Sequence, residues 1–319
     1  MSRKRLPTSR KRGLMQVKNK IRFAIVDAIY IAMMVLPIAL AITLKVLFTP
    51  EASGIVVSGA RVFFEIPMPL QPFAVSEAMV NSWVAMMMIT GLCLFLTHGA
   101  KADIELKRQL FAEMLVEKAK SLVNDNMGEH LSVFGPFIAA ILGLSAFSSL
   151  MSLFGVFPAT ADINVVAGWA ILVFILITYY KLKCGPLNYL KGFTEPIAFF
   201  APINVFSEIA TPFSMAFRHY GNLLSGLVIS VLLSSAFGGL SSAVLSWAPS
   251  WLSQIPILQV GIPAILSLYF DVFSGVLQAY IFANLTMLNI SQGFNYDLYK
   301  ERKRKKLEKQ AKKENGQAA

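Results

Sequence analysis

Six long apolar runs constrain this chain more than any other feature of its sequence. A helix needs about 20 apolar residues to cross the hydrocarbon part of a bilayer, and every run is close to that length or longer. The runs cover residues 23–48, 76–98, 133–157, 164–182, 197–235 and 260–291. Backbone groups in lipid must find their hydrogen-bond partners within the segment, so we expect each run to be helical. The predicted fold class is therefore an all-α polytopic membrane protein with about six spans.

The composition agrees with a membrane protein and argues against a nucleic-acid-binding one. Apolar residues make up 55% of the chain, charged residues only 15%, and the mean hydropathy is +0.59, unlike a soluble domain. The net charge of +11 arises at the ends, because eighteen of the 29 lysines and arginines lie in residues 1–22 and 300–319. A nucleic-acid-binding face would be spread over a folded surface. We therefore exclude nucleic acid as a partner.

The positions of lysine and arginine set the expected orientation of the spans. Nine basic residues lie in each tail, five in the connection 99–132 and two in the loop 183–192, whereas the other three connections contain only Arg61. Basic connections tend to stay in the cytoplasm, so we expect both termini there and six alternating crossings. The first run begins far from Met1 and has no small-residue cleavage site, which favours a retained span over a signal peptide.

Two polar segments lie outside the spans. Residues 103–125 alternate charged residues with leucine and methionine, which is typical of a helix on the membrane surface, here the cytoplasmic one. The tail after Tyr299 has no apolar stripe, and we expect it to be solvated or frayed. No inverted repeat of the kind found in many secondary transporters is visible.

Arg218 is the only basic residue between Lys191 and Lys300, and it lies near the middle of the fifth run. It is too far from either end of the run to extend its head to the interface. A charge at the bilayer centre costs from about 2.5 to more than 10 kcal/mol, so such residues are usually kept for an ion pathway or a counter-ion. The structural alternative is an ion pair within the chain, with Glu208 as the nearest candidate.

Polar residues line the fifth and sixth runs on one face each. At about 100° per residue, five residues share the face of Arg218: Ser207, Thr211, Ser214, Asn222 and Ser225. Five residues of the sixth run also share a face: Ser267, Asp271, Ser274, Gln278 and Asn289. Such residues can join helices in membranes, but stripes of this length, one basic and one acidic, indicate an ion path. A salt bridge between Asp271 and Arg218 is the alternative for that carboxylate.

No catalytic or metal-binding pattern competes with an ion path. The three histidines, His98, His130 and His219, are scattered and lack metal-ligand spacing, and no phosphate-binding glycine loop is present. We therefore expect no cofactor, no metal and no enzymatic activity of the chain on its own. His219 follows Arg218 but points about 100° away from it. Helix packing is the favoured reading of His219, and proton transfer remains the other.

Four segments in sequence order resemble subunit a of the F-type ATP synthase. They are VNSW (Val80–Trp83), PATADINVVAGWA (Pro158–Ala170), PFSMAFRHYGNLLSG (Pro212–Gly226) and LQAYIFANLTM (Leu277–Met287). The resemblance covers roughly residues 76–292. It divides the chain into four parts: a basic tail 1–22, an extra span with an external loop 23–75, the membrane domain 76–292 and a basic tail 293–319.

The resemblance implies a role for each candidate residue. Arg218 matches the family's essential arginine, with Asn222 and Gln278 as its polar companions, and Asp162 and Asn164 line the fourth span near an access channel. Five further residues complete the expected proton pathway: Asp271, Glu208, Ser214, Ser225 and His219. In the family, the fifth and sixth spans form a long tilted hairpin against a rotating ring of c subunits, with a proton half-channel on either side of the arginine.

The resemblance also implies partners and a location. The expected partners are the c ring, subunit b of the peripheral stalk, the rest of the synthase, membrane lipid and the transported proton, in the plasma membrane of a bacterium. A sodium-driven synthase is the alternative in the same class, and a secondary transporter or a structural scaffold are alternatives from other classes.

The chain departs from the family pattern at four positions. His219 stands where leucine is usual, and Val166 replaces a common threonine. Many members carry a pair of ionisable residues where this chain has Leu227 and Asp271. The usual pair is therefore reduced to the single carboxylate of Asp271.

Overall fold

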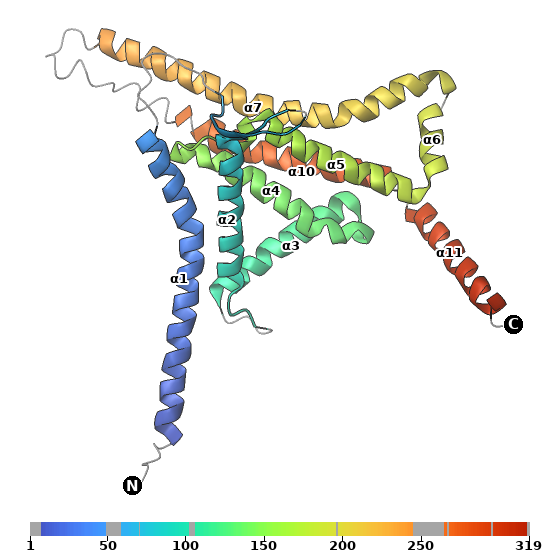
Figure 1. The fold of residues 1–319 in the computed structure, drawn as a ribbon, viewed down its shortest axis with the longest axis horizontal. Coiled ribbons are helices and arrows are strands. Elements are labelled where there is room, and N and C mark those ends of the chain that lie inside the picture. Colours follow the sequence, from blue (N-terminus) through green and yellow to red (C-terminus); the bar gives the residue numbers. More distant parts are fainter. Residues whose placement is uncertain are drawn as a thin grey trace. The chain divides into compact units, whose positions relative to one another are not determined.

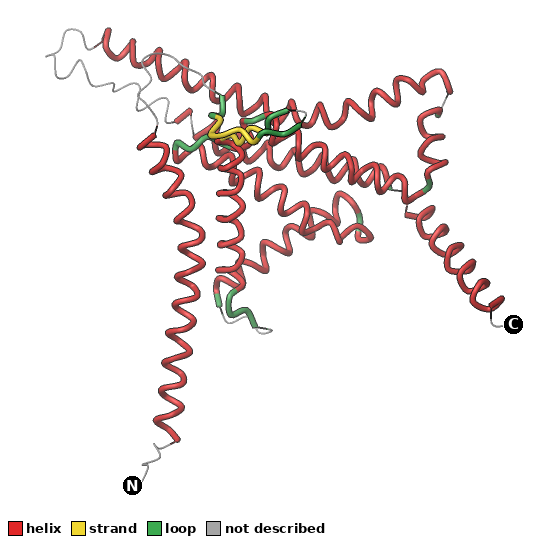
Figure 2. The backbone as a smooth tube through the Cα atoms, viewed as in Figure 1, coloured by secondary structure: helices red, strands yellow, loops and turns green. Residues whose placement is uncertain are grey.

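The computed structural model describes residues 8–48, 59–69, 71–101, 106–195, 197–244, 265–266, 268–294 and 296–317. In these residues the protein is almost entirely helical (Figures 1 and 2). The chain forms two compact units, Met1–Thr49 with Trp83–Glu117 and Pro50–Ser82 with Lys118–Ala319. Two features of the predicted sixth run, its start at 260–264 and Ser267 of its polar face, lie outside the described residues.

In the first unit, the extra N-terminal span packs on the helix that follows it. Helix α1 (Thr8–Phe48) contains one internal proline, and α2 covers Glu77–Thr97. The two backbones approach so closely that a Cβ atom on Gly91 of α2 would lie 3.1 Å from the backbone oxygen of Tyr30 and 3.1 Å from the backbone nitrogen of Met34. A larger residue at position 91 would push these helices apart.

An ion-pair cluster joins α1 to the end of α2 and the start of α3 (Lys107–Met127). Asp27 Oδ1 lies 2.7 Å from His98 Nδ1, and Asp27 Oδ2 accepts a hydrogen bond from an Arg108 guanidinium nitrogen at 2.9 Å. A second guanidinium nitrogen of Arg108 donates to the His98 carbonyl at 2.7 Å. The Arg108 guanidinium also lies over the Phe23 ring, 4.9 Å from its centroid. We call these residues the Asp27 clamp.

The second unit contains the remaining spans. Its helices are α4 (Gly135–Leu150), α5 (Ile163–Cys184), α6 (Pro186–Thr194), α7 (Ala201–Val244), α10 (Gly275–Gly293) and α11 (Tyr296–Gln317). Short 3-10 turns at Glu129–Phe134, Met151–Phe154, Ala159–Ala161 and Ala198–Phe200 connect them, and a π-helical turn at Leu268–Ser274 leads into α10. Helix α10 packs on α4 and α5, and the long α7 runs along α5 (Figure 1).

The core of this unit is a layer of apolar side chains between α3, α4, α5, α7 and α10. Its fully or nearly fully buried members include Val123, Ile138, Val173, Met215, Phe282, Met287 and Ile290. Many other apolar side chains on these helices remain exposed, among them Phe213 and Phe217 of α7. That is the pattern of helices surrounded by lipid or by partner helices rather than by water.

The fold class is confirmed. Six helices in the described residues are long and apolar enough to cross a membrane: Lys20–Leu47, Glu77–Thr97, Glu129–Phe154, Ile163–Cys184, Ala201–Val244 and Leu268–Gly293. The surface helix predicted at 103–125 corresponds to α3, which begins at Lys107. Its first predicted residues, 103–105, lie outside the described part.

Two elements differ from expectation. A small antiparallel hairpin, β1 (Val62–Ile66) paired with β2 (Phe73–Ser76), lies in the loop between the first two spans. The tail after Tyr299, predicted to be solvated or frayed, forms helix α11, and its side chains at residues 300–305 are exposed, so this part of the tail is solvated but helical. Pairs one turn apart support this helix, with Lys305 hydrogen-bonded to Glu301 and Arg304 paired with Glu308. The hydrogen bond from Lys305 lowers the pKa of Glu301.

Candidate ion path along α7 and α10

Arg218 projects from the middle of α7 and remains exposed in the isolated chain. Among the residues that the structure describes, no hydrogen bond or ion pair joins it to another side chain, so neither in-chain alternative is seen. Glu208 pairs with Lys181 instead of Arg218, and Asp271 forms no ion pair with the arginine. Because a cation at this depth needs compensation, the face that carries it calls for water or for a partner.

The polar faces of the fifth and sixth runs meet at one point, as expected for an ion path. Asn222 of α7 donates from Nδ2 to Ser274 Oγ at 2.9 Å, and Ser274 Oγ lies 3.1 Å from Asn222 Oδ1. The helices are close here, since a Cβ atom on Gly226 would lie 3.4 Å from Phe270 Cβ. This contact lies one turn beyond Arg218 along α7.

Asp271 and Ser274 belong to the π-helical turn at Leu268–Ser274. A π turn contains more residues per turn than an α-helix, so the 100° spacing used for the sixth run does not hold there. Asp271 is half-buried, whereas Gln278, on the regular helix that follows, is buried with 6% exposure. Irregular turns of this kind are frequent at functional sites.

Asp162 and Asn164 lie at the start of α5, where Asp162 caps the helix. Asp162 Oδ1 accepts a hydrogen bond from the backbone nitrogen of Asn164 at 2.9 Å, and its Oδ2 accepts one from the Ser76 hydroxyl at 3.0 Å. The carboxylate thus ties the end of β2 to α5. This is a structural task, and a role in proton access stays a prediction for both residues.

His219 is fully buried among α4, α5 and α10. Its Nε2 lies 3.1 Å from Ser145 Oγ, and its ring meets Phe282 and Trp169 edge-on, at centroid distances of 5.5 and 6.4 Å. Its Nδ1 has no hydrogen-bond partner in the described part of the chain. These contacts favour the packing reading of His219.

Buried hydroxyl groups on α4 were not singled out from the sequence. Ser148 Oγ accepts a hydrogen bond from the Thr160 backbone nitrogen at 3.1 Å, and Ser149 lies so close to α10 that a Cβ on Gly275 would be 2.6 Å from Ser149 Cβ. Ser145, Ser148 and Ser149 are all fully buried. Ser148 and Ser149 follow Ser145 by three and four residues within an apolar run, and this spacing could have indicated that the three serines share one helix face.

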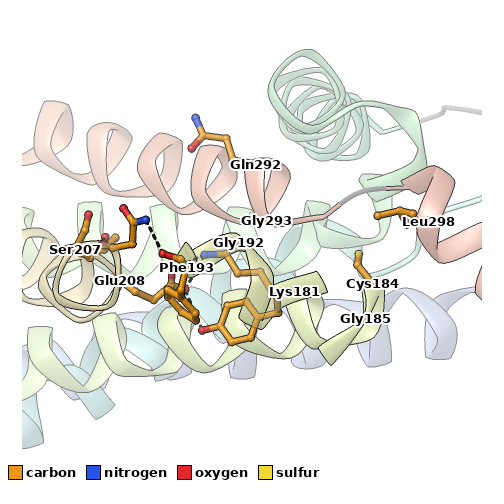
Figure 3. Close-up of a pocket in the computed structure, with 13 residues that line it drawn as sticks. Lys181, Cys184, Gly185, Gly192, Phe193, Ser207, Glu208, Gln292, Gly293 and Leu298 are labelled. Carbon is orange, nitrogen blue, oxygen red and sulfur yellow. Dashed lines mark hydrogen bonds and ion pairs between the residues drawn. The ribbon is translucent and has the colours of Figure 1, made fainter. Parts of the chain in front are cut away.

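Lys181 was also not singled out from the sequence. Its Nζ donates to both carboxylate oxygens of Glu208, at 2.6 and 2.7 Å (Figure 3). The Tyr189 hydroxyl donates to the same carboxylate at 3.5 Å, and burial, followed by the charge of Glu208, raises the pKa of Tyr189. These residues line a cavity of about 470 Å³ between α5, α6, α7 and α10. A lysine at the end of an apolar run usually extends its ammonium group to the membrane interface, so the sequence did not indicate that Lys181 pairs with Glu208.

Comparison with known proteins decides the family. A family model described as ATP synthase A chain matches residues 79–291. The chain belongs to the ATP synthase A chain family. The resemblance drawn from the four sequence segments is thereby confirmed, and α1 precedes the matched region.

Individual relatives of this family cover most of the chain. ATP synthase subunit a of Acidothermus cellulolyticus is 31% identical over 223 residues, 66% of this chain and 74% of the relative. ATP synthase subunit a 1 of Crocosphaera subtropica is 27% identical over 224 residues, 69% of this chain and 87% of the relative. The sodium-ion-specific ATP synthase subunit a of Propionigenium modestum is 27% identical over 294 residues, 80% of this chain and 94% of the relative.

Proposed function

We propose that this chain is the stator subunit of the F-type ATP synthase membrane sector. It provides two proton half-channels against a rotating c ring, so that proton flow drives rotation and ATP synthesis. Membership of the ATP synthase A chain family carries the proposal. The exposed Arg218, central on a spanning helix with a polar face, supports it, because a family partner would cover that face.

The chemistry of Arg218 follows from its charge. A cation facing the ring stabilises a ring carboxylate as an anion only while that carboxylate passes. The carboxyl group must therefore release its proton before passage and bind one afterwards. Two half-channels, offset on either side of Arg218, convert this requirement into rotation. The electrical driving force is about 2.3 kcal/mol per charge per 100 mV, and Arg218 prevents its loss by repelling protons from a direct route.

The same residues suggest which groups serve each half-channel. On the external side we place Asp271, Gln278, Asn222 and Ser225, with Asp162 and Asn164 near the entrance. On the cytoplasmic side we place Ser214 and Glu208. Subunit b of the peripheral stalk, the c ring and lipid are the proposed partners, in a bacterial plasma membrane with both termini in the cytoplasm. The chain does not act as an enzyme on its own.

Arg218→Ala in the assembled complex tests the proposal. Loss of the cation should abolish coupled ATP synthesis and permit passive proton leakage, both measurable in inverted vesicles. Arg218→Lys should also fail largely, since lysine is a point charge that loses its proton more readily when desolvated. Arg304→Ala, which removes an exposed guanidinium on α11 away from this face, is the control. Near-normal ATP synthesis by Arg218→Ala in a complex that retains its ring would remove the proposal.

A sodium-driven synthase remains the second candidate, and the Propionigenium modestum relative is the observation in its favour. Residues of the ring, which this chain does not contain, are expected to choose the ion. ATP hydrolysis by the purified complex at several sodium concentrations distinguishes the two. Activation by sodium at neutral pH would favour the second candidate.

A further inference from the structure

Two cavities meet at a single ion pair in the second unit. The larger has a volume of about 470 Å³ and the smaller about 290 Å³. Five residues line both: Lys181, Glu208, Thr211, Gln292 and Gly293. Tyr189 and Gly192 of α6 line only the larger cavity, and Phe174 and Asn289 line only the smaller one. The Lys181–Glu208 pair therefore lies between an outer and an inner cavity.

The inner cavity leads toward Arg218. Asn289, which lines the inner cavity but not the outer one, donates a hydrogen bond to Met215 Sδ at 3.7 Å, and Met215 lies three residues before Arg218 on α7. Phe174 and Ile177, also in its wall, precede Lys181 on α5. The outer cavity extends the other way, past the end of α5 at Cys184. Both cavities have room for ordered water, which needs about 30 Å³ a molecule.

The ion pair is well placed to control passage between the cavities. The Lys181 ammonium is within 2.7 Å of both Glu208 oxygens, and the two side chains retain 24% and 17% of their exposure. Figure 3 shows Lys181 reaching across from α5 to the Glu208 carboxylate on α7. The carboxylate can thus exchange protons with water, while the ammonium occupies the position that another cation would need.

We propose that Lys181 and Glu208 form the gate of the half-channel between Arg218 and the α5–α6 end of the protein. This inference rests on the proposed function. A proton released from the ring through the inner cavity binds a Glu208 carboxylate oxygen, which neutralises the acid and frees the Lys181 ammonium. Glu208 then gives the proton to water in the outer cavity, and the restored carboxylate pairs with Lys181 again. Lys181 is a positioning residue and Glu208 carries the proton.

A purely structural ion pair would join α5 to α7 without carrying protons. Replacing a buried pair by apolar residues is often neutral for folding or stabilising. Lys181→Met with Glu208→Met should therefore assemble with the ring yet conduct poorly, whereas a purely structural pair would leave conduction normal in this double variant. Glu208→Gln should lower proton conduction by about tenfold or more, as expected on loss of a proton-transferring group. Glu208→Asp should retain more conduction than Glu208→Gln.

Cysteine accessibility tests the gate without relying on activity. With both native cysteines replaced by serine, Asn204→Cys places a thiol in the outer cavity alone and Asn289→Cys places one in the inner cavity alone. Ag⁺ added from the cytoplasmic side should react quickly with the outer thiol and slowly with the inner one. Adding Lys181→Met and Glu208→Gln together should raise the inner rate several-fold and leave the outer rate unchanged.

The outcomes separate the gate from the proposed function. The gate would be overturned if Ag⁺ reacted with the Asn289→Cys thiol at the same rate whether or not Lys181 and Glu208 were replaced. Normal proton conduction by Glu208→Gln would also overturn it. If either occurs while Arg218→Ala still abolishes synthesis, the gate alone fails. Near-normal synthesis by Arg218→Ala would instead remove the rotary channel itself.

Discussion

Asp271 is the single carboxylate within the apolar part of the sixth span, and the chain lacks the second ionisable group that many family members carry. It lies half-buried in the π-helical turn, three residues before the Ser274 that bonds Asn222. In the proposed external half-channel, Asp271 is therefore the carboxylate available to accept a proton near the contact between α7 and the sixth span. The reduced set makes the role of Asp271 easier to test.

Asp271→Asn should slow proton flow and ATP synthesis by about tenfold or more, because the amide cannot exchange protons, while assembly remains intact. Proton pumping by inverted vesicles measures the effect. Asp297→Asn, which changes an exposed carboxylate at the start of α11, is the matched control. Unchanged pumping by Asp271→Asn would assign the relay to Asp162, Glu208 or water alone.

His219 gives the contrasting expectation at the same scale. Its ring fills space between Phe282 and Trp169, and its Nε2 contacts Ser145. His219→Leu, which introduces the residue usual in the family, should leave proton conduction nearly unchanged. It should lower the stability of the subunit by about 1–3 kcal/mol, because the buried Ser145 hydroxyl loses a partner. Thermal inactivation of the complex measures the second effect, and a large loss of conduction would make His219 a proton carrier.

Some features of the site could be predicted from the sequence of one helix, and others depend on how the helices pack. The Arg218 stripe could be predicted because residues of one helix share a face at a fixed angular period. The pair between Lys181 and Glu208 could not, because it depends on which two helices pack together and at what height. The π-helical turn also escaped prediction, since its altered period around Asp271 has no signature in the apolar pattern.

At the scale of elements, length and apolarity were sufficient to predict six spans, because a bilayer imposes both on any helix that crosses it. The elements outside the bilayer were harder. The hairpin of β1 and β2 exposes Phe63 and Phe64 and shows no polar alternation that would mark a strand. Helix α11 has no apolar stripe, and its support comes from pairs such as Glu301 with Lys305, which composition alone does not reveal.

The Asp27 clamp makes α1 a testable element, because it supplies the charged contacts that hold this helix. No residue in the most apolar 18-residue stretch of the Lys20–Leu47 span is buried, so few apolar contacts reinforce the clamp. In Arg108→Ala, the Asp27 carboxylate keeps only its contact with His98. Loss of the charged hydrogen bond costs at most about 1–3 kcal/mol of stability, and less where water screens the charges, because the Asp27 side chain is 20% exposed. We expect faster amide hydrogen exchange in α1 in lipid nanodiscs.

The control for the clamp is Asp125→Ala, which removes an exposed carboxylate on α3 that contacts only Ser121 among the described residues. Exchange in α1 should not change in this variant. If Arg108→Ala also leaves the exchange of α1 unaltered, contacts such as the close approach at Gly91 are sufficient to hold the helix, and the clamp is not its main support.

At the scale of the whole molecule, the face of α7 that carries Arg218 is the reason for expecting a partner. Arg218, Ser214 and Ser225 are exposed on it, next to the exposed apolar residues Phe213 and Phe217. Lipid would suit the phenylalanines but not the guanidinium, and water would suit the guanidinium but not the phenylalanines. A protein surface that is apolar with one carboxylate at the right depth suits both, which agrees with a c ring.

The last prediction concerns orientation. Both tails carry nine basic residues each, and an even number of spans brings them to the same side of the membrane. The positive-inside rule makes that side the cytoplasm, where anionic lipid attracts each lysine or arginine near the surface by about 1 kcal/mol. A reporter that is active only in the cytoplasm, fused after Ala319 or before Lys4, should therefore be active at either end. The paired reporter that is active only outside the cell should be silent in both fusions, and a signal from it at either end would remove a span or reverse the topology.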